Sequence, residues 1–323
     1  MTMRPEEFDL QKFERGRKYA FDLEPGAPVM GVRLPILLAR GRNPGKVLVV
    51  MAGVHGDEYE GVRAILDTYA VLDPNEMSGD LLAVPVANPP AFWNTTRTSP
   101  LDDGNLAREF PGASDRGETA AIALHLSGTI IARADFFLDL HSGGIKLLMP
   151  TMAGYDTDES QSREAALAFG ARVLWGHPQI SPGRTISFAK AQGIPWLYTE
   201  ARGAGRIHPE DLKFFNEGIR RLMIHLSILP GHLPRTKAEC HLLGCGDIDG
   251  SAIATVRGFF IPDVELLQRV VVGEELGRIV DLHGKTAETF RAPRDGIVAM
   301  IRALPVVQPG DPIFLITGLM VES

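Results

Sequence analysis

The chain has 323 residues and a mass of 35.1 kDa, enough to bury one large hydrophobic core, or one core and a smaller domain. Hydrophobic residues make up 45% of the sequence and charged residues 23%, which is ordinary for a soluble globular protein. The net charge of -7 argues against sequence-independent binding of nucleic acid, because such binding needs a basic surface. A few arginines in one pocket would still suffice to bind an acidic small molecule.

The sequence predicts a cytoplasmic protein. Its N-terminal stretch MTMRPEEFDLQKFERGRKY alternates in charge and lacks the apolar core of a signal peptide. No apolar run approaches the roughly 20 residues that cross a bilayer, so we expect no membrane association. Cys240 and Cys245 are the only cysteines, which excludes the disulfide scaffold of a small secreted domain.

Strands and helices alternate through the first part of the chain. After an extended lead-in, VMGVRLPILLARG predicts a strand pair, or one long strand broken near Pro35, and residues 47–51 predict a buried strand. EYEGVRAILDTYAVL then has helical periodicity, with one apolar stripe: Val62, Ile65, Leu66, Tyr69 and Leu72. GDLLAVPVANPPAFW is a short apolar run stopped by prolines, GETAAIALHLSGTIIARA predicts an alanine-rich helix, and DFFLDLHSG predicts a strand that ends in a polar turn.

The alternation continues with a helix in SQSREAALAFGARVLW, a strand in IPWLYTEARG and a helix over residues 209–229. This order predicts an α/β fold with a mixed, largely parallel sheet that is covered by helices on both faces. Ligands bind beyond the carboxyl ends of the strands in such sheets. His55, His141 and Glu200 each follow a predicted strand, and this shared position is the first argument for a single site.

The pattern changes after LPGHLPRTK. From about residue 237 onward, short β-rich runs are separated by glycines, and no convincing helix pattern follows. We therefore predict two domains. Residues 1–235 form the catalytic domain, and residues 236–323 form a small all-β domain.

His55 and Glu58 are separated by two residues, so both side chains can face one point at a strand-to-helix turn. A catalytic zinc usually has three protein ligands and a water, and two histidines with one glutamate are one recognised set. His141 is the best candidate for the third ligand, and Glu200 is the candidate general base. With such ligands the ion keeps a net charge of +1, which favours acidification of water and polarisation of a carbonyl.

Each of these residues also has a simpler explanation. Asp57 and Glu58 are suited to the N-terminus of a helix, where Asp57 would cap and Glu58 would interact with the dipole. His141 by itself would be a hydrogen-bonded turn residue, and Glu200 by itself a solvated carboxylate or an ion-pair partner. Their joint occurrence at strand ends favours a common site.

The motifs resemble those of the zinc-dependent succinylglutamate desuccinylase and aspartoacylase family, which is related in fold to the metallocarboxypeptidases. GVHGDE resembles the first metal motif of the family and implies His55 and Glu58 as ligands. DLHSGG resembles the second and implies His141, while TEARGAG implies Glu200 as the catalytic glutamate. The resemblance covers most of the chain and implies one Zn²⁺ per chain.

Between the two metal motifs lies NPPAFWNTTRTSPLDDGNLAREFPG. The family carries an arginine early in this segment, and Arg97 matches it, which implies a role in polarising the scissile carbonyl or holding its oxyanion. Arg108 matches the arginine of a later Asn-Arg pair, which implies bidentate binding of a substrate carboxylate. Ala107 replaces the asparagine of that pair, which favours a less acidic substrate, and Asn105 is a candidate replacement. The alternative for both arginines is a surface ion pair with a nearby acid: Asp102, Asp103 or Glu109.

The C-terminal stretch APRDGIVAMIRALPVVQPGDPIFLI resembles the small β module behind the catalytic domain of this family, which has the shape of a biotinyl- or lipoyl-carrier barrel. A carrier needs a modified lysine in an exposed hairpin. Lys285 lacks the flanking methionine or acidic context of such a lysine. The module is therefore expected to act as a lid or in assembly, and a homo-oligomer is possible.

Together these features predict a zinc-dependent amidohydrolase that cleaves the acyl-amide bond of a small N-acyl amino acid or a related N-acyl amine. Zn²⁺ and Arg97 would hold the oxyanion, Glu200 would carry the proton from water to the leaving amine, and Arg108 would orient the substrate. Two alternatives remain at this point: a metallocarboxypeptidase acting on short peptides, and a non-catalytic metal-binding relative. Aspartate, glutamate and diaminobutyrate derivatives are all open as substrates.

Overall fold

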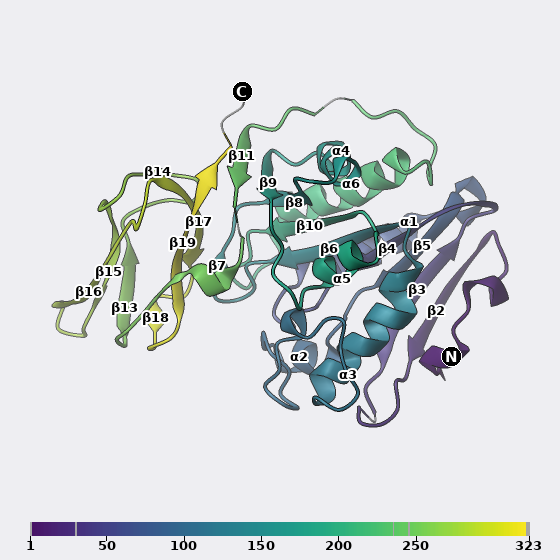
Figure 1. The fold of residues 1–323 in the computed structure, drawn as a ribbon, viewed down its shortest axis with the longest axis horizontal. Helices are drawn as coiled ribbons and strands as arrows, with labels where there is room; N and C mark the ends of the chain where they lie inside the picture. Colours follow the sequence, from purple (N-terminus) through teal and green to yellow (C-terminus); the bar gives the residue numbers. More distant parts are fainter. Residues whose placement is uncertain (1, 30, 235, 245, 321–323) are drawn as a thin grey trace.

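The structure of the protein, a computed structural model, describes residues 2–29, 31–234, 236–244 and 246–320 (Figure 1). Two predictions concern residues outside these ranges. They are the absence of a disulfide at Cys245 and the position of a domain boundary at residue 235. Within the described ranges, no helix is both long enough and apolar enough to cross a bilayer.

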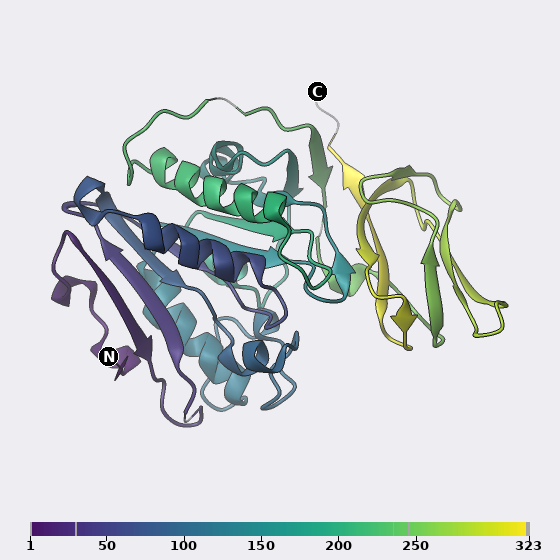
Figure 2. The same ribbon diagram turned by 180° about the vertical axis from the view of Figure 1, so that it is seen from behind.

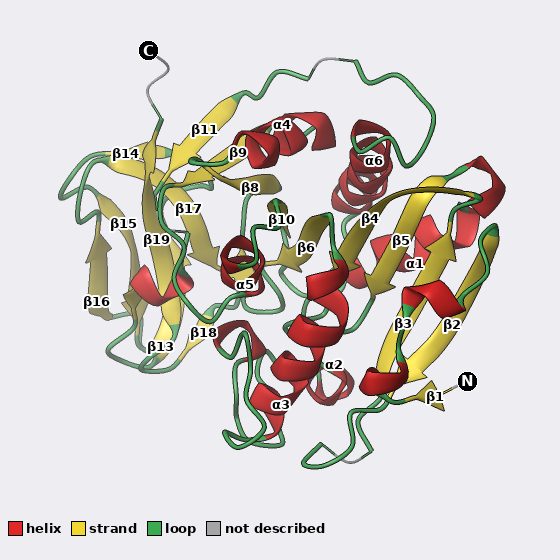
Figure 3. Cartoon of the chain, turned by 45° about the vertical axis from the view of Figure 1, so that its right-hand side comes forward, coloured by secondary structure: helices red, strands yellow, loops and turns green. Residues whose placement is uncertain are grey.

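A long mixed sheet runs through the molecule (Figure 3). Its first strands, in spatial order, are β1 (Thr2–Met3), β2 (Arg17–Leu23), β3 (Leu34–Arg40), β5 (Ser78–Val84), β4 (Asn43–Met51), β6 (Phe136–Ser142), β10 (Trp196–Ala201), β8 (Met152–Asp156), β9 (Val173–His177) and β11 (Cys240–Leu243). β5, β4, β6 and β10 are parallel to one another, whereas β10 and β8 are antiparallel. The predicted mixed α/β sheet is confirmed.

Helices cover both faces of this sheet, also as predicted. One face carries α1 (Glu60–Val71), α4 (Ser160–Phe169) and α6 (Pro209–His225), seen in front of the sheet in Figure 2. The opposite face carries α3 (Glu118–His125) and α5 (Thr185–Ala191), seen in front in Figure 1. Alternate residues of β6 serve the two cores, because Leu138 packs on the α1 side and Phe137 on the α3 side.

The C-terminal region consists of short, mainly antiparallel strands. β19 (Pro312–Leu319), β17 (Gly296–Arg302) and β14 (Arg269–Val270) extend the long sheet beyond β11, with β12 (Ala252–Ile253) and β7 (Leu147–Leu148) paired beside them. A separate antiparallel sheet contains β16 (Thr286–Arg291), β15 (Glu275–Val280), β13 (Gly258–Pro262) and β18 (Val306–Val307). Since β11 pairs with both β9 and β19, hydrogen bonding is continuous past residue 235, and the two-domain division stays a prediction.

One prediction about the N-terminal half, a strand pair or a strand broken near Pro35, was wrong. β3 is one unbroken strand, and Pro35 lies near its start opposite Asp22 of β2, where a missing N–H removes at most one ladder bond. The first forty residues contribute three strands to the sheet: β1, β2 and β3. The prolines after β5 do more than stop a strand, because Pro89 and Pro90 begin helix α2 (Pro89–Asn94), where a fixed φ and a missing N–H fit the first turn.

The lengths of two predicted helices were also wrong, whereas the alanine-rich helix has the predicted extent. The helix predicted from SQSREAALAFGARVLW ends at Phe169, because Gly170 takes a left-handed conformation (φ 95°) and residues 173–177 then form β9. The helix predicted over residues 209–229 ends at His225. The alanine-rich helix is α-helical over α3 and continues as a π turn and a 3-10 turn to Arg133.

Candidate functional site

Three neighbouring parallel strands bring the candidate residues to one edge of the sheet. Strand β6 lies between β4 and β10, and its residue His141 pairs directly with Glu200 of β10. His55 lies in the turn that follows β4. Because the strands are parallel, their carboxyl ends meet at the same edge. This juxtaposition is the one that the positions of these residues after strands predicted.

Glycines shape the turn that carries His55. Gly53 has a φ of 62°, in the left-handed region that favours glycine. Gly56 packs tightly on helix α2, since a Cβ at this position would lie 2.1 Å from the Ala91 carbonyl carbon. Because Gly56 has no side chain, the backbone of the turn between β4 and α1 can lie directly against α2. The glycines that flank His55 thus have a steric reason.

The Glu58 carboxylate lies between the two imidazoles. Its Oε1 atom is 2.7 Å from Nδ1 of His55, and its Oε2 atom is 2.9 Å from Nδ1 of His141. One ligand atom from each of the three residues lies within 4.8 Å of the other two. Two imidazole nitrogens and one carboxylate oxygen this close together fit a four-coordinate Zn²⁺ with one open position.

Each imidazole also has a polar partner on its other nitrogen. Oδ2 of Asp139 lies 3.0 Å from Nε2 of His141, and Oδ1 of Asn105 lies 3.2 Å from Nε2 of His55. Partners of this kind fix the orientation and tautomer of a metal-binding histidine. Asp139 was not among the residues predicted from the sequence. Strand alternation was the available signal, because Asp139 and His141 are two residues apart on β6 and face the same side.

Burial and charge set different ionisation states in the cluster. Burial, assisted by the positive charge of Arg97, lowers the pKa of His55 to about 4. Burial also lowers the pKa of His141, but the Asp139 and Glu58 carboxylates outweigh it and raise that pKa well above its ordinary value. Burial acts to raise the pKa of Glu58, yet the two histidines hold it well below its usual range. Glu58 is therefore ionised, as a carboxylate ligand must be.

The pKa of Glu200 is shifted in the opposite direction from that of Glu58. Burial raises its pKa to about 8, the Glu58 charge adds to this effect, and His141 and Arg97 oppose it. Its Oε2 atom is buried and has no hydrogen-bond partner among the residues that the structure describes. A carboxyl group with a pKa near neutrality is suited to accept and return a proton.

Arg97 lies at the edge of the cluster. Its Nη1 donates to Oε1 of Glu58 at 3.2 Å, and 31% of its side chain is exposed. It lines the same cavity as His55 and Glu200. This position is compatible with the predicted contact to a substrate carbonyl, which stays a prediction.

Asn105 and Arg108, the two residues predicted to bind substrate, both have partners. Asn105 caps one 3-10 turn (Leu106–Arg108), and Arg108 is the last residue of that turn. Besides its contact with His55, Asn105 Oδ1 accepts a hydrogen bond from the Ala107 N–H at 3.0 Å. Arg108 forms ion pairs with Asp247 and Asp249 rather than with any nearby acid along the chain. Their roles in binding substrate stay predictions.

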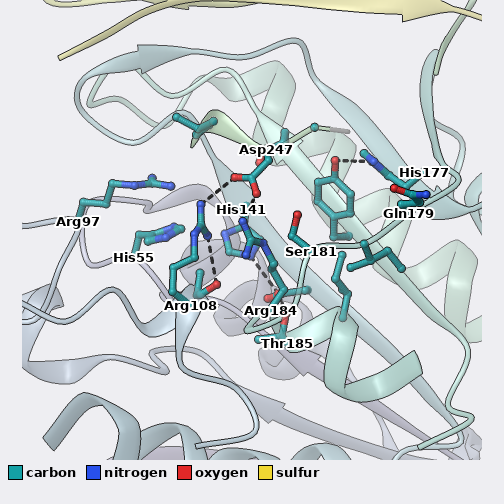
Figure 4. A pocket seen from close by; sticks show the side chains of 18 residues that line it. His55, Arg97, Arg108, His141, His177, Gln179, Ser181, Arg184, Thr185 and Asp247 are labelled. Carbon is teal, nitrogen blue, oxygen red and sulfur yellow. Dashed lines mark hydrogen bonds and ion pairs between the residues drawn. The ribbon is translucent and has the colours of Figure 1, made fainter. Parts of the chain in front are cut away.

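The cluster opens into a cavity whose outer wall comes from three segments, around residues 107–108, 177–186 and 246–248 (Figure 4). His177 and Tyr198 line one side, where His177 Nε2 and the Tyr198 hydroxyl are 2.8 Å apart. Arg184 and Asp247 line another. These four residues were not predicted from the sequence, because no local motif marks them.

Comparison with solved structures gives the class of protein. A succinylglutamate desuccinylase from Silicibacter sp. TM1040 superposes with a TM-score of 0.84 at 27% identity, covering 95% of this chain and 96% of that one. The product-bound ectoine utilization protein EutE (DoeB) from Ruegeria pomeroyi also gives 0.84 at 27% identity, covering 94% and 96%. The fold is that of the amide-hydrolysing desuccinylases and aspartoacylases.

Sequence comparison gives the family. The profile of the succinylglutamate desuccinylase/aspartoacylase catalytic domain matches residues 44–226. The N-alpha-acetyl-L-2,4-diaminobutyric acid deacetylase of Halomonas elongata is 31% identical over 300 residues, covering 90% of this chain and 87% of the relative. The chain belongs to the succinylglutamate desuccinylase/aspartoacylase family, and it is an enzyme, a hydrolase of linear amides.

Proposed function

We propose that this enzyme is a zinc-dependent deacylase that cleaves the acyl-amide bond of a small N-acyl amino acid or a related N-acyl amine. The observation that carries the proposal is the convergence of His55, Glu58 and His141, with ligand atoms within 4.8 Å of one another. Glu200 pairs with His141 on the adjacent strand, so an additional carboxyl group stands beside that convergence. Metal ligands and a separate acid-base group are the two parts that metal-assisted amide hydrolysis needs.

His55 and His141 would hold one Zn²⁺ through their Nδ1 atoms, and Glu58 would hold it through a carboxylate oxygen. When bound in such a site, Zn²⁺ acidifies water and polarises a carbonyl oxygen. Asp139 and Asn105 would keep the two rings oriented by their contacts with the Nε2 atoms. These contacts leave both Nδ1 atoms directed at the common point.

Glu200 would accept a proton from the attacking water and deliver it to the leaving amine. Its location is suited to this step, because its buried Oε2 atom has no partner within the described part of the chain. Arg97 would donate to the carbonyl oxygen as negative charge develops there. The guanidinium lies close to the cluster already, through its contact with Glu58.

The small substrate is supported by the relatives and by the pocket. The Halomonas relative is a deacetylase of an N-acetylated amino acid. In this chain, residues 246–248 from the C-terminal region line the cavity together with His55 and Glu200. We propose that this segment belongs to a separate β domain, residues 236–323, that narrows the entrance. Such a wall favours a short N-acyl amine over a peptide.

The test is metal analysis of the purified protein, followed by a hydrolysis screen of N-acetyl and N-succinyl amino acids with peptides as the comparison. We expect about one zinc per chain and release of a free acid from at least one N-acyl amino acid. Glu200→Gln is expected to retain the metal and to lower kcat by about 10²- to 10⁴-fold. Glu210→Gln, whose side chain is 87% exposed, is the matched control and should retain kcat. A near-normal kcat in Glu200→Gln would remove the general base, and a protein without metal would refute zinc dependence.

A further inference from the structure

Asp247 places a carboxylate from the C-terminal region in the wall of the pocket (Figure 4). Its side chain is 15% exposed, and it caps the 3-10 turn Ile248–Gly250. Oδ1 of Asp247 accepts a hydrogen bond from Nη2 of Arg108 at 2.9 Å, and Oδ2 accepts one from Nη2 of Arg184. The two arginines come from separate loops of the α/β region, so they hold the carboxylate from two sides.

The backbone before Asp247 is also closely packed. A Cβ at Gly246 would lie 2.9 Å from Cε1 of His177 and 3.1 Å from the Tyr198 hydroxyl oxygen. Contacts this short leave no room for a side chain. The Asp247 carboxylate is therefore positioned by backbone packing as well as by ion pairs.

The contacts of Arg108 limit what else this residue can bind. A guanidinium has five N–H donors. In Arg108, Nε donates to Asp249 at 3.0 Å, Nη2 donates to Asp247 at 2.9 Å and to Asp249 at 3.1 Å, and Nη1 donates to the Ala107 carbonyl at 3.1 Å. One donor remains, whereas bidentate binding of a carboxylate needs two parallel donors. With both aspartates in place, Arg108 cannot bind a substrate carboxylate in the way that the family resemblance implies.

The charges in this part of the wall also disfavour a substrate with a side-chain carboxylate. Arg108 and Arg184 alone would attract an acidic side chain, but they face Asp247 and Asp249 at ion-pair distances. A substrate side-chain carboxylate would meet a carboxylate of like charge here, whereas an ammonium would meet one of opposite charge. Ala107, at the position of the family asparagine, supplies no side-chain donor that could compensate.

We propose that Asp247 is a specificity-determining residue that makes the enzyme prefer amines with a side-chain ammonium over amines with a side-chain carboxylate. The inference rests on the proposed deacylase function, because it concerns the amine half of the same substrates. The inference does not depend on the metal cluster. It depends on the position of Asp247 in the wall of the pocket and on the N–H donors of Arg108 that already contact Asp247 and Asp249.

The test compares three N-acetyl amino acids: the cationic Nα-acetyl-2,4-diaminobutyrate, its neutral isostere N-acetylnorvaline and the anionic N-acetylaspartate. We expect the metal-loaded wild-type enzyme to show the highest kcat/KM for the cationic substrate and the lowest for the anionic one. Asp247→Asn, which keeps the shape and removes the charge, should reduce the cationic-to-anionic ratio of kcat/KM by at least about ten-fold, mainly through KM. The neutral substrate should change by less than about three-fold, which separates loss of charge from loss of fold.

The matched control is Asp158→Asn, because the Asp158 side chain is 72% exposed and does not line the cavity. Its cationic-to-anionic ratio should stay within about three-fold of wild type. The proposal is overturned if Asp247→Asn leaves the ratio unchanged, if Asp158→Asn lowers it equally, or if the wild-type enzyme prefers N-acetylaspartate. No hydrolysis of any of the three compounds would overturn the deacylase function as well, whereas hydrolysis without charge preference would overturn this inference alone.

Discussion

The base and the outer wall of the pocket are built in different ways. At the base, the metal candidates and Glu200 lie on strands β6 and β10 or directly after β4, and hydrogen bonds of 2.7–2.9 Å join the candidates. In the wall, Arg108, Arg184 and Asp247 come from turns and are joined by ion pairs between distant parts of the chain. Strand ends are fixed by the hydrogen bonding of the sheet, whereas loops can change without disturbing it. On the functions proposed above, the base would carry the chemistry and the wall would select the substrate.

The largest effect is expected at the base, from His55→Ala. Removal of one of three protein ligands should reduce bound zinc from about one per chain to near zero and abolish hydrolysis. Metal content by mass spectrometry, alongside kcat, checks this outcome. The exposed His283→Ala is the control and should retain the metal. Unchanged zinc content in His55→Ala would refute the assignment of this ligand.

A smaller effect is expected from Asp139→Asn, because Asp139 contacts the ligand candidate His141 and is not itself a ligand candidate. The amide can still contact Nε2 of His141 but lacks the charge that raises the basicity of the ring. Zinc affinity should fall by roughly 10- to 100-fold. Competition with a chelator measures it. Asp135→Asn serves as the control, since Asp135 directly precedes the same strand and its carboxylate contacts the Val47 N–H instead. Equal affinities for the Asp139 variant and wild type would show that Asp139 does not support the metal.

The smallest effect is expected in the wall and appears in stability. Burial lowers the pKa of His177 to about 4, against the opposing effects of the Gly244 backbone and Asp156. The unfolded chain, with an ordinary pKa near 6.5, therefore takes up this proton first as the pH falls. The stability that neutral His177 contributes is complete above about pH 6.5 and is lost progressively as the pH falls towards 4.

His177→Gln removes this titration. The free energy of unfolding of wild type relative to this variant should therefore fall by about 2 kcal/mol between pH 7 and pH 5. Urea unfolding at both pH values measures the difference, and the exposed His283→Gln should show no such change. A difference that does not depend on pH would mean that His177 titrates normally in the folded protein.

Local patterns predicted most of the α/β fold but placed several boundaries wrongly. Apolar periodicity located α1, because a helix with one buried stripe repeats every 3.6 residues. The same criterion extended the helix predicted in SQSREAALAFGARVLW too far, since Val173–Trp175 is apolar in either conformation. Gly170 decides the outcome by allowing a left-handed turn, after which the chain pairs with β8.

The sequence by itself determined the residues at the base. His55, Glu58, His141 and Glu200 stand in short motifs at the ends of predicted strands, and parallel strands bring such ends together whatever the details of packing. Only the tertiary structure decided the partners of Arg108, because Asp247 is 139 residues away and no local pattern links the two. An ion pair between loops depends on where two separate turns arrive in space, which neither periodicity nor motif spacing specifies.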